Sequence, residues 1–454
     1  MTMQSARAIA ADVQSQATSA VAVARAALDR AAEANPKLNA LTCLNPKALS
    51  DARSIDARVA VGEMLPLAGV PIVIKDNIWV KGLSITNGSR LYADFIAPED
   101  AIAVARLRAA GAVILGIGTC SEFACKGLTN TPLHGITRHP ANHNLTPGGS
   151  SGGPAVAVAT GIVPVAIGTD AGGSSRRPPA HVGVVGFKPS QDAIPYGPGF
   201  QEPVWGISTI CPITHDVADA ALVYAVLSRT QTTAALTRNT RFTYAPDMGL
   251  GVAIDHDVAQ ASDAAVAALA EVATITKAAP EWSVDCLPAS IMPLQFAGLA
   301  ALYGDLWRAQ PDQFDPDIGA QIKNGLSLTG VEVAHALQAS QVMRVTLQSF
   351  LSDFDFLITP TTPCPAWPVS QLGPTTIGGQ PASPRDHAAF TPQANHAGVP
   401  AITIPCGFTK QGLPIGLQII GSAGSDAALL SVAQHFETAL RTAGLMQVNV
   451  KANA

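Results

Sequence analysis

Continuous apolar runs alternate with helix-like segments along the first half of the chain. Residues 5–34 are Ala-rich, with apolar side chains near helical spacing and Pro36 just beyond, which predicts helices. The runs at 67–74, 112–118 and 162–168 are apolar without alternation, as in strands buried on both faces. Further helices are predicted between these strands, at 99–110 and 155–160. This order predicts an α/β fold: a single large domain with a mixed, mostly parallel β-sheet covered by helices on both faces.

The second half of the chain gives fewer signals. Residues 229–335 are expected to be mainly helical, and seven prolines from 360 to 384 indicate a surface loop system. Strands are predicted at 401–405 and 415–420, and Asp426 is expected to cap a last helix. The domain is expected to consist of four parts: N-terminal helices at 1–65, a core at 66–225, a variable helical region at 226–335 and a C-terminal core part at 336–454.

Composition excludes several classes of function. Of the 454 residues, 48% are hydrophobic and only 13% are charged, which is enough for a large core. A net charge of −5 gives no electrostatic reason to expect nucleic-acid binding. Residues 148–169 carry no charge, but Pro154 and Pro164 interrupt them, so a membrane span is not expected. Seven cysteines without a CxxC pair predict free thiols in a reducing, cytoplasmic protein.

Three segments carry candidate chemistry. Lys75 ends an apolar strand, where a lysine is either solvated at the strand end or held in a functional site. Residues 147–154 read PGGSSGGP, which suits a chain turn and also fits the G-x-S-x-G pattern of α/β-hydrolases, although no strand precedes its serine. Residues 168–180 read GTDAGGSSRRPPA, which is either a tight turn or a nest of N–H groups that binds an oxyanion.

Taken together and in this order, these segments resemble the amidase signature family. The spacings, 150 − 75 = 75 and 174 − 150 = 24, suit the lysine and the two serines of that family. Further similar segments are VGFKP at 185–189, GVPA at 398–401 and GLPIGLQ at 412–418. The resemblance covers most of 5–225 and 340–445 and is weak between 229 and 335.

The resemblance implies a Ser–cisSer–Lys amidase without metal or cofactor. It assigns Ser174 as nucleophile, Ser150 as proton bridge after a cis peptide bond, and Lys75 as base. The implied oxyanion hole is formed by the N–H groups of Ala171, Gly172, Gly173 and Ser174, and Asp170 and Arg176 would support the loop. The chemistry is consistent, because a serine needs a base and a lysine shielded from water has a lowered pKa.

A Ser–His–Asp hydrolase built on Ser150 is the mechanistic alternative. One of the ten histidines would have to supply the base; His134, His139 and His143 lie in the segment before the glycine loop, and His181 lies after the Ser174 segment. We expect these histidines to be ordinary surface or core residues instead. A phosphate- or nucleotide-binding protein is a further alternative, but the chain contains no G-x-x-x-x-G-K-[ST] motif.

The substrate implied by the resemblance is a small amide. The segment TDAGGSSRRPPAHVGVVGFKPS is most similar to family members that hydrolyse 1-carboxybiuret in cyanuric acid degradation. Arg177, Lys126 and Ser151 are the expected substrate-binding residues, with Arg177 the candidate for a carboxylate. Other small amides, such as indoleacetamide, aliphatic amides or malonamide, are the alternatives within the family.

Two assemblies and two other roles follow from the same resemblance. A small helical partner like the C subunit of a tRNA amidotransferase is expected, in a heterotetramer, or else a homodimer. Glutamine amidotransfer is an alternative activity, but the basic run expected near residues 318–321 is absent. A non-catalytic assembly subunit is the alternative from a different class, although decay of function would be expected to remove Lys75, Ser150 or Ser174 first. Neither a nucleic acid nor a membrane is expected as a partner.

Overall fold

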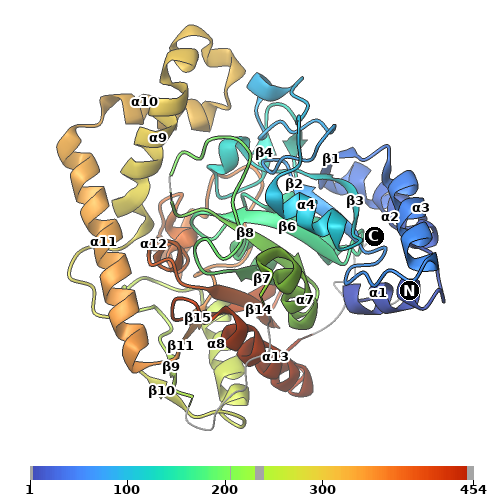
Figure 1. The fold of residues 1–454 in the computed structure, drawn as a ribbon. Helices are drawn as coiled ribbons and strands as arrows, with labels where there is room; N and C mark the ends of the chain where they lie inside the picture. Colours follow the sequence, from blue (N-terminus) through green and yellow to red (C-terminus); the bar gives the residue numbers. More distant parts are fainter. Residues whose placement is uncertain (1–3, 205, 231–239, 447–454) are drawn as a thin grey trace.

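An eleven-stranded sheet runs through the molecule in the order β1-β3-β2-β6-β8-β7-β14-β15-β11-β9-β10 (Figure 1). The computed structural model describes residues 4–204, 206–230 and 240–446. The strands of this sheet are β1 (Leu41–Leu44), β2 (Pro71–Lys75), β3 (Val113–Gly118), β6 (Val165–Asp170), β7 (Val185–Lys188), β8 (Thr209–Thr214), β9 (Phe242–Tyr244), β10 (Ile275–Lys277), β11 (Phe356–Pro360), β14 (Ala401–Phe408) and β15 (Pro414–Gly421). Two small hairpins lie outside it: β4 (Asn130–Thr131) with β5 (Gly135–Ile136), and β12 (Thr376–Ile377) with β13 (Gln380–Pro381).

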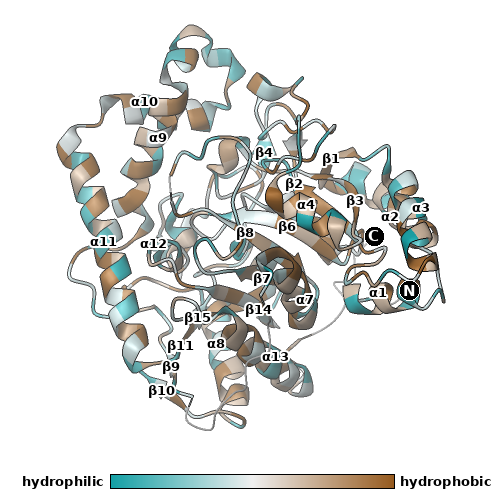
Figure 2. Cartoon of the chain, in the orientation of Figure 1, coloured by the Kyte–Doolittle hydropathy of each residue, from teal (hydrophilic) through white to brown (hydrophobic). Residues whose placement is uncertain are grey.

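Helices cover both faces of the sheet, as the sequence predicted. The described helices are α1 (Ala6–Gln14), α2 (Ala20–Leu38), α3 (Ala48–Ala60), α4 (Ile102–Ala109), α5 (Gly152–Ala159), α6 (Arg177–Val182), α7 (Val217–Ser228), α8 (His256–Leu269), α9 (Pro288–Ala309), α10 (Pro316–Ser327), α11 (Gly330–Asp353), α12 (Pro392–His396) and α13 (Asp426–Thr442). One core contains the inward residues of α4, α7, α8 and α13, and a second contains those of α5. In Figure 2 the apolar colour runs along the whole of α7, which is packed among the sheet, α4 and α13.

The sheet is mixed, but the expectation of mostly parallel pairing is wrong. Four of the ten strand pairs in the described sheet are parallel and six are antiparallel. Continuous apolar strands arise here because helices bury both faces, whichever way neighbouring strands run. The parallel part that matters for the site is β3-β2-β6, at the N-terminal side of the sheet.

The edges of the sheet extend beyond the predicted core. β1 pairs with β3 although its residues lie in the region expected to contain only helices. β9 and β10 come from the region expected to be mainly helical, and they form the opposite edge. Helices α9, α10 and α11 stand away from the sheet as a separate layer (Figure 1), and the expected boundary at 335/336 falls inside α11.

The N-terminal end of α1 is hydrogen-bonded to α7. Asp219 on α7 accepts hydrogen bonds from the backbone N–H groups of Ala6, at 2.6 Å, and Arg7, at 3.1 Å. The Arg7 guanidinium adds an ion pair with the same carboxylate, which is fully buried. Since these are the first N–H groups of α1, Asp219 satisfies donors that a helix leaves unpaired at its start.

In the described parts of the chain, no helix has the length and apolar character needed to cross a bilayer. The uncharged stretch 148–169 forms α5 and most of β6 instead.

Candidate active site

Lys75 stands at the carboxyl end of β2, in the interior of the molecule. Its side chain is fully buried, and β6 runs parallel beside β2, so Thr169 lies at the same edge of the sheet. Lys75 Nζ is 2.8 Å from Thr169 Oγ1 and 3.3 Å from the Thr169 carbonyl oxygen. Asn77 Nδ2 also donates to Thr169 Oγ1, at 3.0 Å. Burial lowers the pKa of Lys75, because removing an ammonium from water disfavours its charged form.

Ser150 is the hydroxyl partner of Lys75. Its Oγ is 2.8 Å from Lys75 Nζ, and the side chain is fully buried. The peptide bond between Gly149 and Ser150 is cis. Ser150 immediately precedes the Ser151–Gly152 turn into α5, so the glycine loop carries this hydroxyl to the end of β2.

Ser174 lies on the neighbouring loop, which leads from β6 into α6. The two loops are joined because the Ser151 N–H donates to the Ser174 carbonyl, at 3.2 Å. The Ser174 side chain reaches a cavity at the surface of the site, and 7% of the residue is exposed. Ser150 therefore contacts Lys75 from a loop whose next residue, Ser151, is bonded to Ser174.

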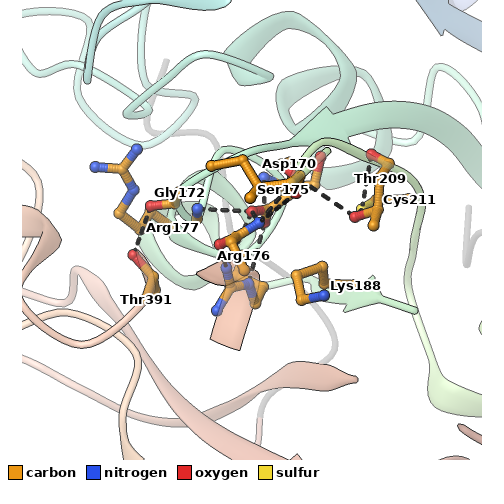
Figure 3. A network of polar contacts seen from close by, with 12 residues as sticks. Asp170, Gly172, Ser175, Arg176, Arg177, Lys188, Thr209, Cys211 and Thr391 are labelled. Atoms are coloured by element: carbon orange, nitrogen blue, oxygen red, sulfur yellow. Dashed lines mark hydrogen bonds and ion pairs between the residues drawn. The ribbon is translucent and has the colours of Figure 1, made fainter. Parts of the chain in front are cut away.

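Asp170 and Arg176 form the base of this loop. Asp170 accepts hydrogen bonds from the N–H groups of Gly173 and Ser175, and it is paired with the Arg176 guanidinium at 3.0 Å (Figure 3). Arg176 Nη1 also donates to Gln418, and Arg176 Nη2 to Asn395. Burial alone would raise the pKa of Asp170, but Arg176 and Asn395 outweigh it and hold that pKa well below its usual range. Both groups are fully buried, so the pair fixes the loop from beneath.

The loop presents three backbone N–H groups without an acceptor in the part of the chain described. These belong to Ala171, Gly172 and Ser174, all of which line the cavity. The fourth expected donor differs from the prediction, since the Gly173 N–H is held by Asp170 Oδ1 at 2.6 Å. Gly173 is needed for another reason: its φ is +108°, and a Cβ there would lie 2.2 Å from Thr391 Oγ1.

The cavity beside Ser174 is small. Its volume is about 70 Å³. Arg177 lies on its wall and extends away from the Asp170–Arg176 network (Figure 3). Ile291 and Met292 of α9 supply apolar wall, so the helical layer far along the chain completes the site.

The other two residues expected to bind the substrate, Lys126 and Ser151, are engaged in contacts within the protein. Lys126 lines the cavity, but its ammonium forms an ion pair with Asp315 and also donates to Asn130. Ser151 is fully buried behind the loop, where its hydroxyl bonds to Ser175 Oγ and the Thr169 carbonyl. Charge compensation removes Lys126 as an anion binder, and burial removes Ser151 from contact with a ligand in the cavity.

Histidines do not provide a base for Ser150. His139 bonds to the His181 carbonyl, and His134 bonds to Thr86. In the described residues, the amine of Lys75 is the only basic side chain bonded to the Ser150 hydroxyl. The geometry therefore favours the lysine over the histidine alternative.

Several residues at the site were missed in the sequence. Thr169 contacts the Lys75 amine, and Asn77 bonds to Thr169. The only signal for them in the sequence was that each lies within two residues of Lys75 or Asp170. Arg385 lines the cavity and His387 contacts Arg177, both from the segment just after the proline-dense part of the chain. No spacing or motif marks them, because they are placed by the tertiary fold alone.

Comparison with known proteins agrees with this geometry. Residues 22–430 match the Amidase family. The chain is 33% identical to a glutamyl-tRNA(Gln) amidotransferase subunit of Symbiobacterium thermophilum, over 92% of this chain and 93% of that protein. It is 35% identical to an acylamidase of Rhodococcus erythropolis, over 95% of this chain and 94% of that protein.

Solved structures include a similar chain from work on a vestigial protein complex that reveals the evolutionary origins of an s-triazine catabolic enzyme. It superposes with a TM-score of 0.86 at 26% identity, covering 98% of this chain and all of that one. The single large α/β domain is thus shared along the whole chain, including the helical layer where the sequence resemblance is weak.

Proposed function

Because this chain belongs to the amidase family and is an amide-hydrolysing enzyme, we propose that it cleaves the C–N bond of a small urea-like amide and releases ammonia. The proposed substrate type is 1-carboxybiuret or biuret. The observation that carries the mechanism is the buried contact of 2.8 Å between Lys75 Nζ and Ser150 Oγ, on a loop that is hydrogen-bonded to Ser174 through the N–H of Ser151. Metal and cofactor have no part in the proposed steps.

The nucleophile is Ser174, and its proton leaves through Ser150. Neutral Lys75 accepts the Ser150 proton while Ser150 accepts the proton of Ser174. Burial favours the neutral amine, since it lowers the pKa of Lys75. The Ser174 oxygen attacks the amide carbon, ammonia departs with the proton returned along the same path, and water then hydrolyses the acyl-enzyme.

The oxyanion forms against the loop between β6 and α6. The free N–H groups of Ala171, Gly172 and Ser174 stabilise the negative charge on the tetrahedral intermediate. Loss of one such donor typically costs about 3 kcal/mol of transition-state stabilisation. Asp170 and Arg176 hold the loop in place and take no part in proton transfer.

The cavity supports a small, anionic substrate. A volume of about 70 Å³ lies well below the roughly 300–1,000 Å³ of pockets that hold drug-sized ligands, which favours a small substrate. Arg177 lies in the wall and supplies positive charge for a carboxylate. Similarity, at 26% identity, to a chain linked to the origins of an s-triazine catabolic enzyme also supports a nitrogen-rich, urea-like substrate.

Glutamine amidotransfer is the second candidate. It is favoured by the 33% identity to the glutamyl-tRNA(Gln) amidotransferase protein of Symbiobacterium thermophilum. In that case the chain would act with a small helical partner protein and pass ammonia on. The same partner in a heterotetramer, or a homodimer, is also proposed for the hydrolase.

Ammonia release from freshly generated 1-carboxybiuret tests the proposal. Glutamine and indoleacetamide serve as parallel substrates, and Ser174→Ala as the inactive control. We expect release from 1-carboxybiuret to exceed the other two, and no release with Ser174→Ala. Release only from another amide would keep the amidase chemistry and contradict the urea-like substrate. If a serine-reactive phosphonate fails to label Ser174, the serine mechanism is wrong and the non-catalytic alternative is favoured.

A further inference from the structure

Two arginines line the cavity, and in the described chain no carboxylate lies within ion-pair distance of either. Arg177 begins α6, and Arg385 belongs to the loop between β13 and α12; both line the cavity that Ser174 reaches. In the described chain, neither forms an ion pair. Arg385 Nη2 donates to the Cys125 carbonyl at 2.6 Å, and Arg177 Nη2 to the Gly149 carbonyl at 3.4 Å. Both contacts position a guanidinium and leave its charge in place.

Lys126 lines the same cavity, but its positive charge is compensated by carboxylates. Its ammonium is paired with Asp315, and Asp317 lies 3.4 Å away. Arg177 is buried just as deeply, yet its Nε has no hydrogen-bond partner in the described structure. Burial and the nearby positive charge of Arg385 lower the pKa of Arg177 to about 9. Such an arrangement is unfavourable until an anion enters, because buried charge needs a counter-charge.

His387 explains how Arg177 is held without losing its charge. Arg177 Nη1 lies 3.2 Å from His387 Nδ1. Arginine has no acceptor, so Nδ1 accepts and the imidazole is neutral with its proton on Nε2. Burial, followed by the charge of Arg177, lowers the pKa of His387 well below its usual value.

The imidazole ring has little freedom to move. It packs on Trp367 with ring centroids 4.6 Å apart, and a Cβ on Gly127 would lie 2.2 Å from His387 Nε2. A neutral acceptor in a fixed ring directs the guanidinium as a carboxylate would, but cancels none of its charge.

We propose that Arg177 and Arg385 together bind a carboxylate of the substrate, with His387 as the positioning residue for Arg177. This inference rests on the proposed function, to which it adds the second arginine, the positioning residue and the substrate class. The class is a small amide that carries a carboxylate within a few bonds of the scissile carbonyl. Each guanidinium presents the fork of N–H donors that a carboxylate accepts.

Binding of malonamate and malonamide tests the anion site independently of turnover. The two ligands have the same shape and differ in one carboxylate, and Ser174→Ala prevents hydrolysis during calorimetry. We expect malonamate to bind at least tenfold tighter than malonamide. Arg385→Gln in this background should weaken malonamate binding by about 10- to 100-fold and leave malonamide within about threefold.

Companion variants separate charge from structure. Arg385→Lys keeps the charge and should retain most of the preference for malonamate. His387→Glu places a carboxylate beside Arg177 and should abolish the preference, whereas Arg308→Gln, at an exposed arginine on α9, should change neither ligand. Equal weakening of both ligands by Arg385→Gln would overturn the inference, and so would the absence of malonamate binding. Failure of the proposed function would be seen in a different measurement: the chain with Ser174 intact would release no ammonia from any of the amides tested.

Discussion

At the scale of single residues, burial decides the chemistry of Lys75. An ammonium in water has no capacity to accept a proton at neutral pH, whereas the fully buried Lys75 has a lowered pKa. Sequence motifs located this lysine and the two serines, since their order and spacing are specific. Arg385 and His387 were beyond reach, because the proline-dense segment around them has no periodicity that predicts its path.

Lys75→Met should therefore lower kcat/KM by about 10³-fold or more while the fold persists. In the unmodified chain, kcat/KM should rise with pH and level off above the pKa of Lys75, because only the neutral amine accepts a proton. A pH–rate profile on the best amide substrate measures this. Lys188→Met is the matched control, since it removes another buried lysine and should preserve the profile. A profile unaltered by Lys75→Met would contradict the mechanism.

At the scale of elements, continuous apolar runs identified the central strands, but short edge strands escaped prediction. β1 is only four residues long and partly exposed, and β9 has three residues, too few for a pattern. The mixed direction of the sheet was equally hidden, because burial on both faces makes parallel and antiparallel strands look alike. Two buried lysines nevertheless lie at strand ends: Lys75 ends β2, and Lys188 ends β7.

Lys188 should make stability depend on pH. Burial, followed by the charge of Arg176, lowers its pKa to about 8, below an unfolded value of about 10.4. Between these values the unfolded chain binds more protons, so the contribution of Lys188 to the free energy of unfolding rises with pH. The rise is on the order of 3 kcal/mol. Urea unfolding at pH 7 to 10 should show the difference between the unmodified chain and Lys188→Met growing in favour of the former; a constant difference would contradict it.

At the scale of the whole molecule, distant segments are joined through buried polar contacts. Asp219 binds the first N–H groups of α1, more than 200 residues away. The helical layer of α9 likewise reaches the cavity from a region where sequence resemblance was weak. The fold class is confirmed as a single α/β domain, although the sequence left the role of this layer open.

Asp219→Ala should loosen the start of the chain. It leaves two backbone N–H groups without their buried acceptor, at a cost of about 1–3 kcal/mol each. Limited proteolysis should then cut between α1 and α2 faster than in the unmodified chain, as measured by mass spectrometry of the fragments. Asp29→Ala, at an exposed position on α2, is the control and should cut at the original rate.

The loops that carry Ser150 and Ser174 lie within 40 residues of each other, whereas Arg385 and His387 arrive from a separate, irregular segment some 200 residues later. Irregular segments tolerate substitution, insertion and deletion better than strands do. Natural variation in that segment can therefore exchange one substrate for another while the bond-breaking apparatus is inherited unchanged. With the anion site as proposed, a change of substrate in this scaffold requires changes in one loop only, at no cost to the serines and lysine that break the bond.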